Sequence, residues 1–196
     1  MIEIDIHATS DGELVCIHDS TLNRTTSGRG DVHSFTYGEI KELDAGAGQS
    51  IPTLEETLRF ASGKMKVNIE LKIIGAEEEV LEIVQRTGML PNVIISSFFH
   101  ATLTVLKESN EQVSTAMLLN ASREELFQYA LDFRVDAINP QHNLVTPELV
   151  KGAHQTGLLV YPWTVNEQHR MIDLFSMGVD GLITDYPDRA VRVLGH

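Results

Sequence analysis

Three carboxylates are spaced so that they could bind a divalent metal ion. Glu3 and Asp5 lie two residues apart in an apolar run with strand character, so their side chains share one face. Glu70 and Lys72 repeat this spacing in a second run, on the face that also carries Asn68. Carboxylates gathered inside a protein raise each other's pKa unless a cation offsets their charge. Their oxygen atoms suit Mg²⁺ or Ca²⁺, so we expect Glu3, Asp5 and Glu70 to bind one such ion.

Two simpler interpretations of these residues stay open. If the first run forms an edge strand, Glu3 and Asp5 face water and need no cation. If Glu70 pairs with Lys72, the second run contains an internal ion pair instead of a metal ligand. The metal site is favoured because two separate runs show the same unusual pattern.

A histidine and a tryptophan are further candidates for chemistry. His18 is followed directly by Asp19 and has an ordinary pKa close to neutrality, so it could exchange protons beside a metal-bound phosphate. The alternative is a loop histidine held by hydrogen bonds. Trp163 falls at the end of another expected strand, where it could pack against a substrate. Its alternative role is that of a core residue.

The elements that must position these residues follow a regular alternation. Short apolar or β-branched runs alternate with helical stretches, and from the second run onward they start roughly every 20–27 residues, the length of one strand-helix unit. The runs span residues 2–6, 66–71, 93–98, 114–119, 136–139, 158–163 and 181–184. Such alternation requires parallel strands and favours a (β/α)₈-type TIM barrel in one domain over residues 1–196. A complete barrel takes about 250 residues, so a chain of 196 is short by about one unit.

Two expected helices begin with a capping box, a hydroxyl residue followed three positions later by a glutamate. These pairs are Thr53 with Glu56 and Ser122 with Glu125. They predict helix starts just after residues 53 and 122.

Residues 10–49 break the alternation. Asp11 and Gly12 lie between two apolar runs, which is a strong signal for a hairpin. A polar stretch follows that contains His18. Because this excursion follows a barrel strand, we expect a hairpin and loop insertion over the barrel mouth, where such folds keep their chemistry.

Composition excludes several classes of protein. The 15 Lys and Arg residues against 28 Asp and Glu residues give a net charge of −13, which argues against a nucleic-acid partner. No apolar window reaches the length of about 18 residues that a membrane span needs. The single cysteine, Cys16, gives no sign of a disulfide, and Met1 is followed by acidic residues where a signal peptide would be basic. We therefore expect a cytoplasmic protein.

Several segments of the chain resemble the motifs of the glycerophosphodiester phosphodiesterase family, in the family's order. These segments are residues 3–19, 22–30, 51–56, 68–72, 97–98, 163–166 and 178–187. The resemblance implies a phosphodiesterase version of the TIM barrel that hydrolyses glycerophosphodiesters to glycerol 3-phosphate and an alcohol.

The resemblance also implies roles for individual residues. Glu3, Asp5 and Glu70 would bind a divalent cation, Mg²⁺ or Ca²⁺. His18 would be a catalytic acid or base, and Lys72 would contact the substrate phosphate. Trp163, which lies in a matching segment, stays a candidate for packing against the glycerol or alcohol portion.

Two motifs of the family have no counterpart in the sequence. They are a His-Arg-Gly motif that ends the family's first strand and a Glu-Asn-Thr motif that opens the next helix. We therefore expect a chain that lacks the first strand-helix unit and has impaired activity, either through truncation or as a natural fragment. A signal peptide lost with that unit is an open alternative, and a second copy of the chain is one candidate to cover the open barrel seam. Two other functions stay open: a catalytically dead phosphate-binding module and another metal-assisted barrel enzyme.

Overall fold

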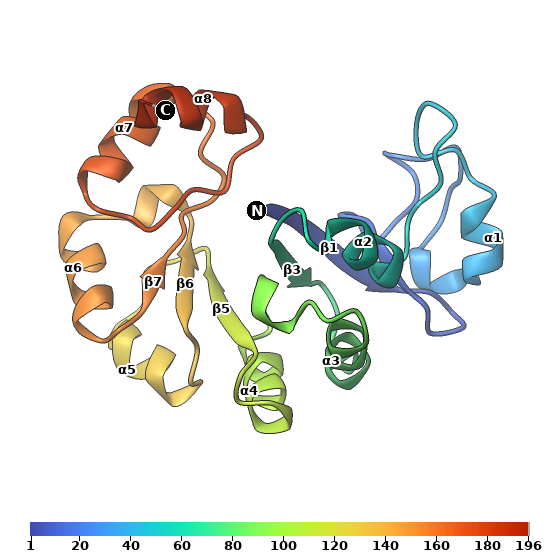
Figure 1. The fold of residues 1–196 in the computed structure, drawn as a ribbon, viewed down its shortest axis with the longest axis horizontal. Coiled ribbons are helices and arrows are strands. Elements are labelled where there is room, and N and C mark those ends of the chain that lie inside the picture. The colour runs from blue at the N-terminus through green and yellow to red at the C-terminus, as the bar shows by residue number, and fades with distance from the viewer. Residues whose placement is uncertain (196) are drawn as a thin grey trace. The chain divides into compact units, whose positions relative to one another are not determined.

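The computed structural model describes residues 1–195, which form two compact units (Figure 1). The first unit spans Met1–Ser114 and the second begins at Thr115. Strands and helices alternate in both units, as the sequence pattern predicts. None of the helices in the described part of the chain is both long and apolar enough to cross a membrane.

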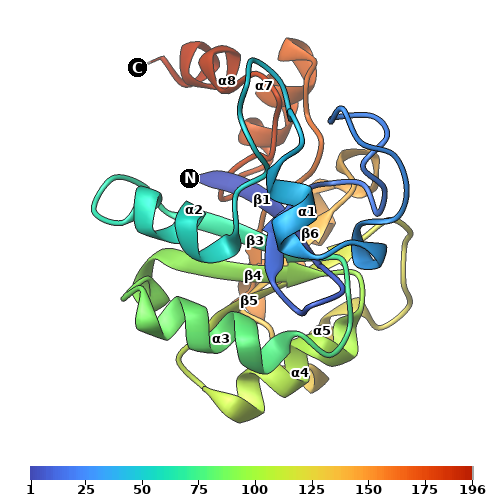
Figure 2. The same ribbon diagram turned by 90° about the vertical axis from the view of Figure 1, so that its right-hand side faces the viewer.

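The first unit contains three parallel strands and a short antiparallel one. β1 (Ile2–Ala8) pairs with β3 (Val67–Leu71), and β3 pairs with β4 (Val93–Ser97). The antiparallel strand β2 (Leu14–Cys16) pairs with the end of β1. Neighbouring helices contact one another along these strands (Figure 2). They are α2 (Leu54–Ala61), α3 (Glu77–Arg86) and α4 (His100–Ser109); the short η2 (Leu90–Asn92) lies between α3 and β4 in the chain.

β3 is buried on both faces, but its two faces differ in chemistry. Val67, Ile69 and Leu71 belong to the hydrophobic core, whereas Asn68 and Glu70 are buried on the opposite face. Charged residues are rarely buried without a partner or a function. This polar face is therefore the candidate position for a functional site in the first unit.

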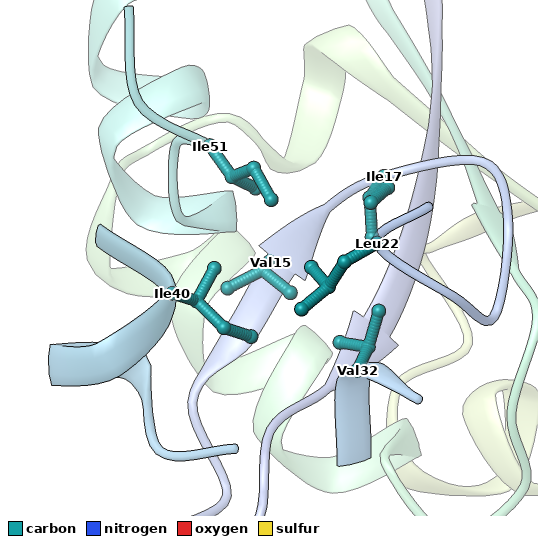
Figure 3. Packing of buried hydrophobic residues seen from close by; sticks show 6 residues of the cluster. All are labelled: Val15, Ile17, Leu22, Val32, Ile40 and Ile51. Atoms are coloured by element: carbon teal, nitrogen blue, oxygen red, sulfur yellow. The ribbon is translucent and has the colours of Figure 1, made fainter. Parts of the chain in front are cut away.

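The segment after β1 forms the expected hairpin and then packs around its own small core. The turn between β1 and β2 includes Gly12, whose φ of 87° lies in the left-handed region that glycine adopts readily. The following loops carry η1 (Val32–Ser34) and α1 (Tyr37–Lys41). Their buried apolar side chains point toward one another in Figure 3: Val15, Ile17, Leu22, Val32, Ile40 and Ile51. This core holds in place a long irregular segment that contains His18.

The second unit repeats the same architecture. β5 (Ser114–Leu119) pairs in parallel with β6 (Ala137–Pro140), which pairs with β7 (Leu159–Val160). The helical elements of this unit are α5 (Leu126–Asp132), η3 (His142–Leu144), α6 (Pro147–Gln155), α7 (Gln168–Ser176) and α8 (Pro187–Leu194).

Two strand predictions in the second unit need correction. The strand expected over residues 158–163 is reduced to Leu159–Val160, and residues 181–184 form no regular strand. The latter segment makes single backbone hydrogen bonds instead, from Ile183 N to Pro162 O and from Val165 N to Ile183 O. Pro162 has no N–H to donate, so a continuous hydrogen-bond ladder cannot form there.

One capping box is confirmed and the other is wrong. Glu56 N donates to Thr53 Oγ1 at 3.1 Å, and Thr53 N donates to Glu56 Oε2 at 3.0 Å, which completes the box that starts α2. Helix α5 starts only after Glu125, which is its left-handed N-cap residue with φ of 51°, and Ser122 caps nothing there. The hydroxyl-to-glutamate spacing is a local signal, and here the backbone conformation of Glu125 overrides it.

Candidate functional site

The three carboxylates predicted from the sequence converge in the first unit. Glu3 and Asp5 project from the same face of β1, and Asp5 lies opposite Glu70 in the register between β1 and β3. One ligand oxygen from each of the three side chains lies within 4.8 Å of the other two. This is the spacing at which three carboxylates can share one cation.

Lys72 supplies the positive charge that pairs with this carboxylate cluster. Its Nζ is 3.0 Å from Asp5 Oδ1 and 2.5 Å from Glu70 Oε1. Burial lowers the pKa of Lys72, but hydrogen bonding to Glu70 and the charges of Glu70 and Asp5 raise it above its ordinary value overall. The Glu70–Lys72 ion pair considered from the sequence is therefore present, and it lies within the carboxylate cluster.

The remaining negative charge makes full ionisation of the cluster unfavourable. Glu3 is exposed, but desolvation by surrounding protein atoms and the charges of Asp5 and Glu70 raise its pKa to about 8. Desolvation by burial also raises the pKa of Glu70, despite the nearby Lys72. A divalent cation would offset this repulsion, and a purely carboxylate donor set fits a hard ion. The residues therefore fit the metal site that the sequence predicts.

His18 is held close to the cluster through the backbone of its loop. Ile17 N donates to Asp5 O at 3.0 Å, and His7 Nε2 donates to His18 O at 3.3 Å. The loop after β2 is thus tied to the strand that carries Glu3 and Asp5. The His18 side chain itself is 64% exposed, so solvent and a ligand can both reach its ring.

Asp19 and Arg24 fix the orientation of the His18 ring. His18 Nδ1 lies 2.7 Å from Asp19 Oδ1, and Arg24 donates to both oxygens of that carboxylate at 2.7 and 2.8 Å. Hydrogen bonds from Arg24 and His18 hold the pKa of Asp19 well below its usual range. When Nδ1–H donates to Asp19, Nε2 stays available for proton exchange.

The sequence favours an ordering role for Arg24 and a hydrogen-bonded or surface role for His7, but it did not predict that Arg24 binds Asp19 or that Asp19 and His7 bond to His18. The adjacent His18 and Asp19, with an arginine five residues later, are the signal that could have suggested the Asp19–Arg24 pair. The hairpin places His7 opposite Val15, so the hydrogen bond from His7 to His18 O depends on the path of the loop after β2. These contacts depend on tertiary structure more than on local spacing.

Trp163 belongs to the second unit, whereas the other predicted site residues belong to the first. It follows β7, and its indole Nε1 donates to Asn139 O at 2.7 Å. Its side chain is partly exposed. The structure therefore brings Glu3, Asp5, Glu70, Lys72 and His18 together in the first unit and places Trp163 in the other.

The groups of this site have the chemistry that phosphate-ester cleavage requires. A cation bound by carboxylates can polarise a phosphoryl oxygen, an ammonium group can balance phosphate charge, and an oriented imidazole can transfer a proton. No comparable group of three metal-ligating side chains occurs elsewhere in residues 1–195.

Comparisons with known proteins agree with this chemistry. Residues 1–189 match the model of the glycerophosphoryl diester phosphodiesterase family. A glycerophosphodiester phosphodiesterase from Caldanaerobacter subterraneus subsp. tengcongensis is 37% identical over 206 residues, covering 98% of this chain and 85% of that protein.

Solved structures show the same likeness. A phosphodiesterase from Oleispira antarctica, in complex with the product sn-glycerol-3-phosphate, is 25% identical with a TM-score of 0.89, over 99% of this chain and 84% of the other. A glycerophosphodiester phosphodiesterase from Agrobacterium tumefaciens is also 25% identical, with a TM-score of 0.86 over 97% of this chain and 85% of the other. These likenesses confirm the expected (β/α)₈-type α/β fold class. The chain therefore belongs to the glycerophosphoryl diester phosphodiesterase family and is a phosphoric diester hydrolase.

Proposed function

We propose that this protein hydrolyses glycerophosphodiesters to glycerol 3-phosphate and an alcohol, with Mg²⁺ or Ca²⁺ bound by Glu3, Asp5 and Glu70. The observation that carries the proposal is the convergence of these carboxylates around Lys72. The product seen in the Oleispira antarctica relative supports the glycerol 3-phosphate half of the substrate.

The charged groups of the cluster would bind and orient the substrate phosphate. When bound, a divalent cation supplies positive charge that stabilises the phosphoryl oxygens in the transition state. Lys72 would donate to a phosphate oxygen and stays close to the cluster through Asp5 and Glu70. Trp163 would pack against the glycerol or alcohol portion.

His18 would move the proton that the reaction requires. Hydrolysis forms a bond from a water oxygen to phosphorus and breaks the phosphorus–oxygen bond to the alcohol, so the water loses one proton and the alcohol oxygen takes one up. Where a substrate hydroxyl attacks first, it forms a cyclic phosphodiester that water then opens. With Nδ1 bonded to Asp19, His18 would exchange a proton at Nε2. The Asp19–Arg24 contact keeps this nitrogen in one orientation.

The proposal is tested by following glycerol 3-phosphate release from glycerophosphocholine with Mg²⁺ or Ca²⁺ and with a chelator. We expect release that requires a cation and that Glu70→Gln abolishes. Glu78→Gln, the same substitution at an exposed position of α3, is the matched control and should leave the rate unchanged. Binding of glycerol 3-phosphate without turnover by the unaltered protein would contradict the proposal and indicate a binding module.

A further inference from the structure

Two buried oxygen atoms next to the carboxylate cluster lack hydrogen-bond partners. They are Asn68 Oδ1 and Ser96 Oγ, and neither has a partner within the described part of the chain. Asn68 is 4% exposed and Ser96 is fully buried. A buried polar atom without a partner is unfavourable, so such an atom in a folded protein calls for a bound water, an ion or a ligand.

Both residues lie on the polar face and border the cluster. In the strand register, Asn68 is opposite Glu3, and Ser96 is opposite Glu70. Alternation along β3 and β4 puts Asn68, Glu70 and Ser96 on the same face. Each of the two residues therefore neighbours a carboxylate of the cluster on an adjacent strand.

Ser97, the next residue on β4, is a buried serine whose hydroxyl does have hydrogen-bond partners. Ser97 points to the opposite face, donates from Oγ to Leu71 O at 2.9 Å and accepts from Phe99 N at 3.0 Å. Ser96 and Ser97 are equally buried. Burial alone therefore does not explain the unpaired Ser96 Oγ, which lies on the face that carries the carboxylates.

A divalent cation needs more ligands than three carboxylates provide. Ca²⁺ takes six to eight oxygens, and Mg²⁺ takes six and usually keeps several waters. We propose that Asn68 and Ser96 belong to this cation site as neutral groups that hold water molecules bound to the cation. The inference rests on the proposed cation binding by Glu3, Asp5 and Glu70 and extends it to two uncharged residues.

If Asn68 and Ser96 hold cation-bound water, replacing them should weaken cation binding without weakening the fold. Apolar replacements remove an unsatisfied buried oxygen, so Asn68→Leu and Ser96→Ala should keep or raise the melting temperature when no cation is present. Their cation affinity should fall about 10- to 100-fold, as it does when groups that support metal ligands are removed. A purely structural role predicts a lower melting temperature and unchanged affinity.

The experiment measures cation binding and stability without reference to turnover. Mg²⁺ and Ca²⁺ are titrated calorimetrically into the unaltered protein, Asn68→Leu, Ser96→Ala and the control Ser97→Ala, and each is melted in chelator. Ser97→Ala should lower the melting temperature, because it loses two hydrogen bonds, and should keep its cation affinity. If Asn68→Leu does not fold, Ser96→Ala alone decides the question.

The outcomes separate this inference from the proposed function. Weaker binding by the variants with an intact melting temperature supports the inference. Tight binding by the unaltered protein and equal binding by the variants overturns the inference and leaves the carboxylate site standing. Absence of cation binding by the unaltered protein overturns both.

Discussion

Arg24 holds the Asp19 carboxylate through both Nε and Nη2, at 2.7 and 2.8 Å, while His18 bonds to the same carboxylate. Arg24 and His18 are both largely exposed, and exposed ion pairs add little to folding stability. The pair is better explained by geometry: it fixes a flexible imidazole in an irregular loop. Arg24 is accordingly a positioning residue for His18.

Replacing Arg24 should therefore slow turnover without unfolding the protein. In Arg24→Leu we expect kcat to fall roughly 10- to 100-fold, because a misplaced proton-transfer group loses alignment with the reacting atoms. KM and the melting temperature should change little. The matched control is Arg59→Leu, which breaks a similarly exposed pair with Glu55 on α2. Equal loss of activity in both variants would contradict the positioning role.

Replacing His18 itself should lower kcat more than replacing Arg24 does. His18→Ala should lower kcat roughly 10²- to 10⁴-fold, the usual contribution of one acid or base group. Cation affinity should be unchanged, since Glu3, Asp5 and Glu70 are intact. Steady-state kinetics and calorimetry measure the two effects, with His33→Ala, an exposed histidine of η1, as control. A kcat close to that of the unaltered protein would assign proton transfer to another group.

The raised pKa of Glu3, about 8, predicts how pH affects stability without a cation. The folded state binds this proton more tightly than the unfolded state, whose carboxyl has an ordinary pKa near 4.5. The stabilisation is therefore complete below about pH 4.5 and is lost as pH rises toward about 8. Urea unfolding in chelator between pH 5 and 8.5 should show this decline, and Glu3→Gln should flatten it. An equal slope in both proteins would refute the assignment to Glu3.

Much of this site follows from the sequence because strand alternation is a strong constraint. Two acidic residues at positions 3 and 5 must share a face, and a buried polar face on β3 marks a neighbouring strand. The helix start at Thr53 was predictable for a similar reason, since both partners of its capping box lie within four residues.

Features that depend on distant contacts were not predictable in this way. The segment 181–184 is as apolar as the other runs, but its neighbour includes Pro162, which has no N–H for a ladder. The unpaired oxygens of Asn68 and Ser96 become visible only when β3 and β4 lie side by side. Composition and periodicity describe each strand singly and say nothing about which atoms lack partners.

Lys72 offers the sharpest test of the charge balance in the site. Its ammonium group forms ion pairs with both Asp5 and Glu70, and its side chain is only 21% exposed. Lys72→Met leaves these carboxylates without their positive partner, so the free energy of unfolding in chelator should fall by about 3 kcal/mol. Lys66→Met, an exposed lysine next to β3, is the control and should leave stability unchanged.

Added cation should then reverse the defect in Lys72→Met. A divalent ion that binds only the folded state stabilises it in proportion to the logarithm of its concentration, and here it no longer competes with an internal ammonium group. We expect Mg²⁺ or Ca²⁺ to restore the melting temperature and to bind at least as tightly as in the unaltered protein. Glycerol 3-phosphate should bind more weakly, because the proposed contact between Lys72 and the phosphate is lost. If added cation did not restore the stability of the variant, Asp5 and Glu70 would serve only as ion-pair partners of Lys72. That result would contradict the proposed metal site.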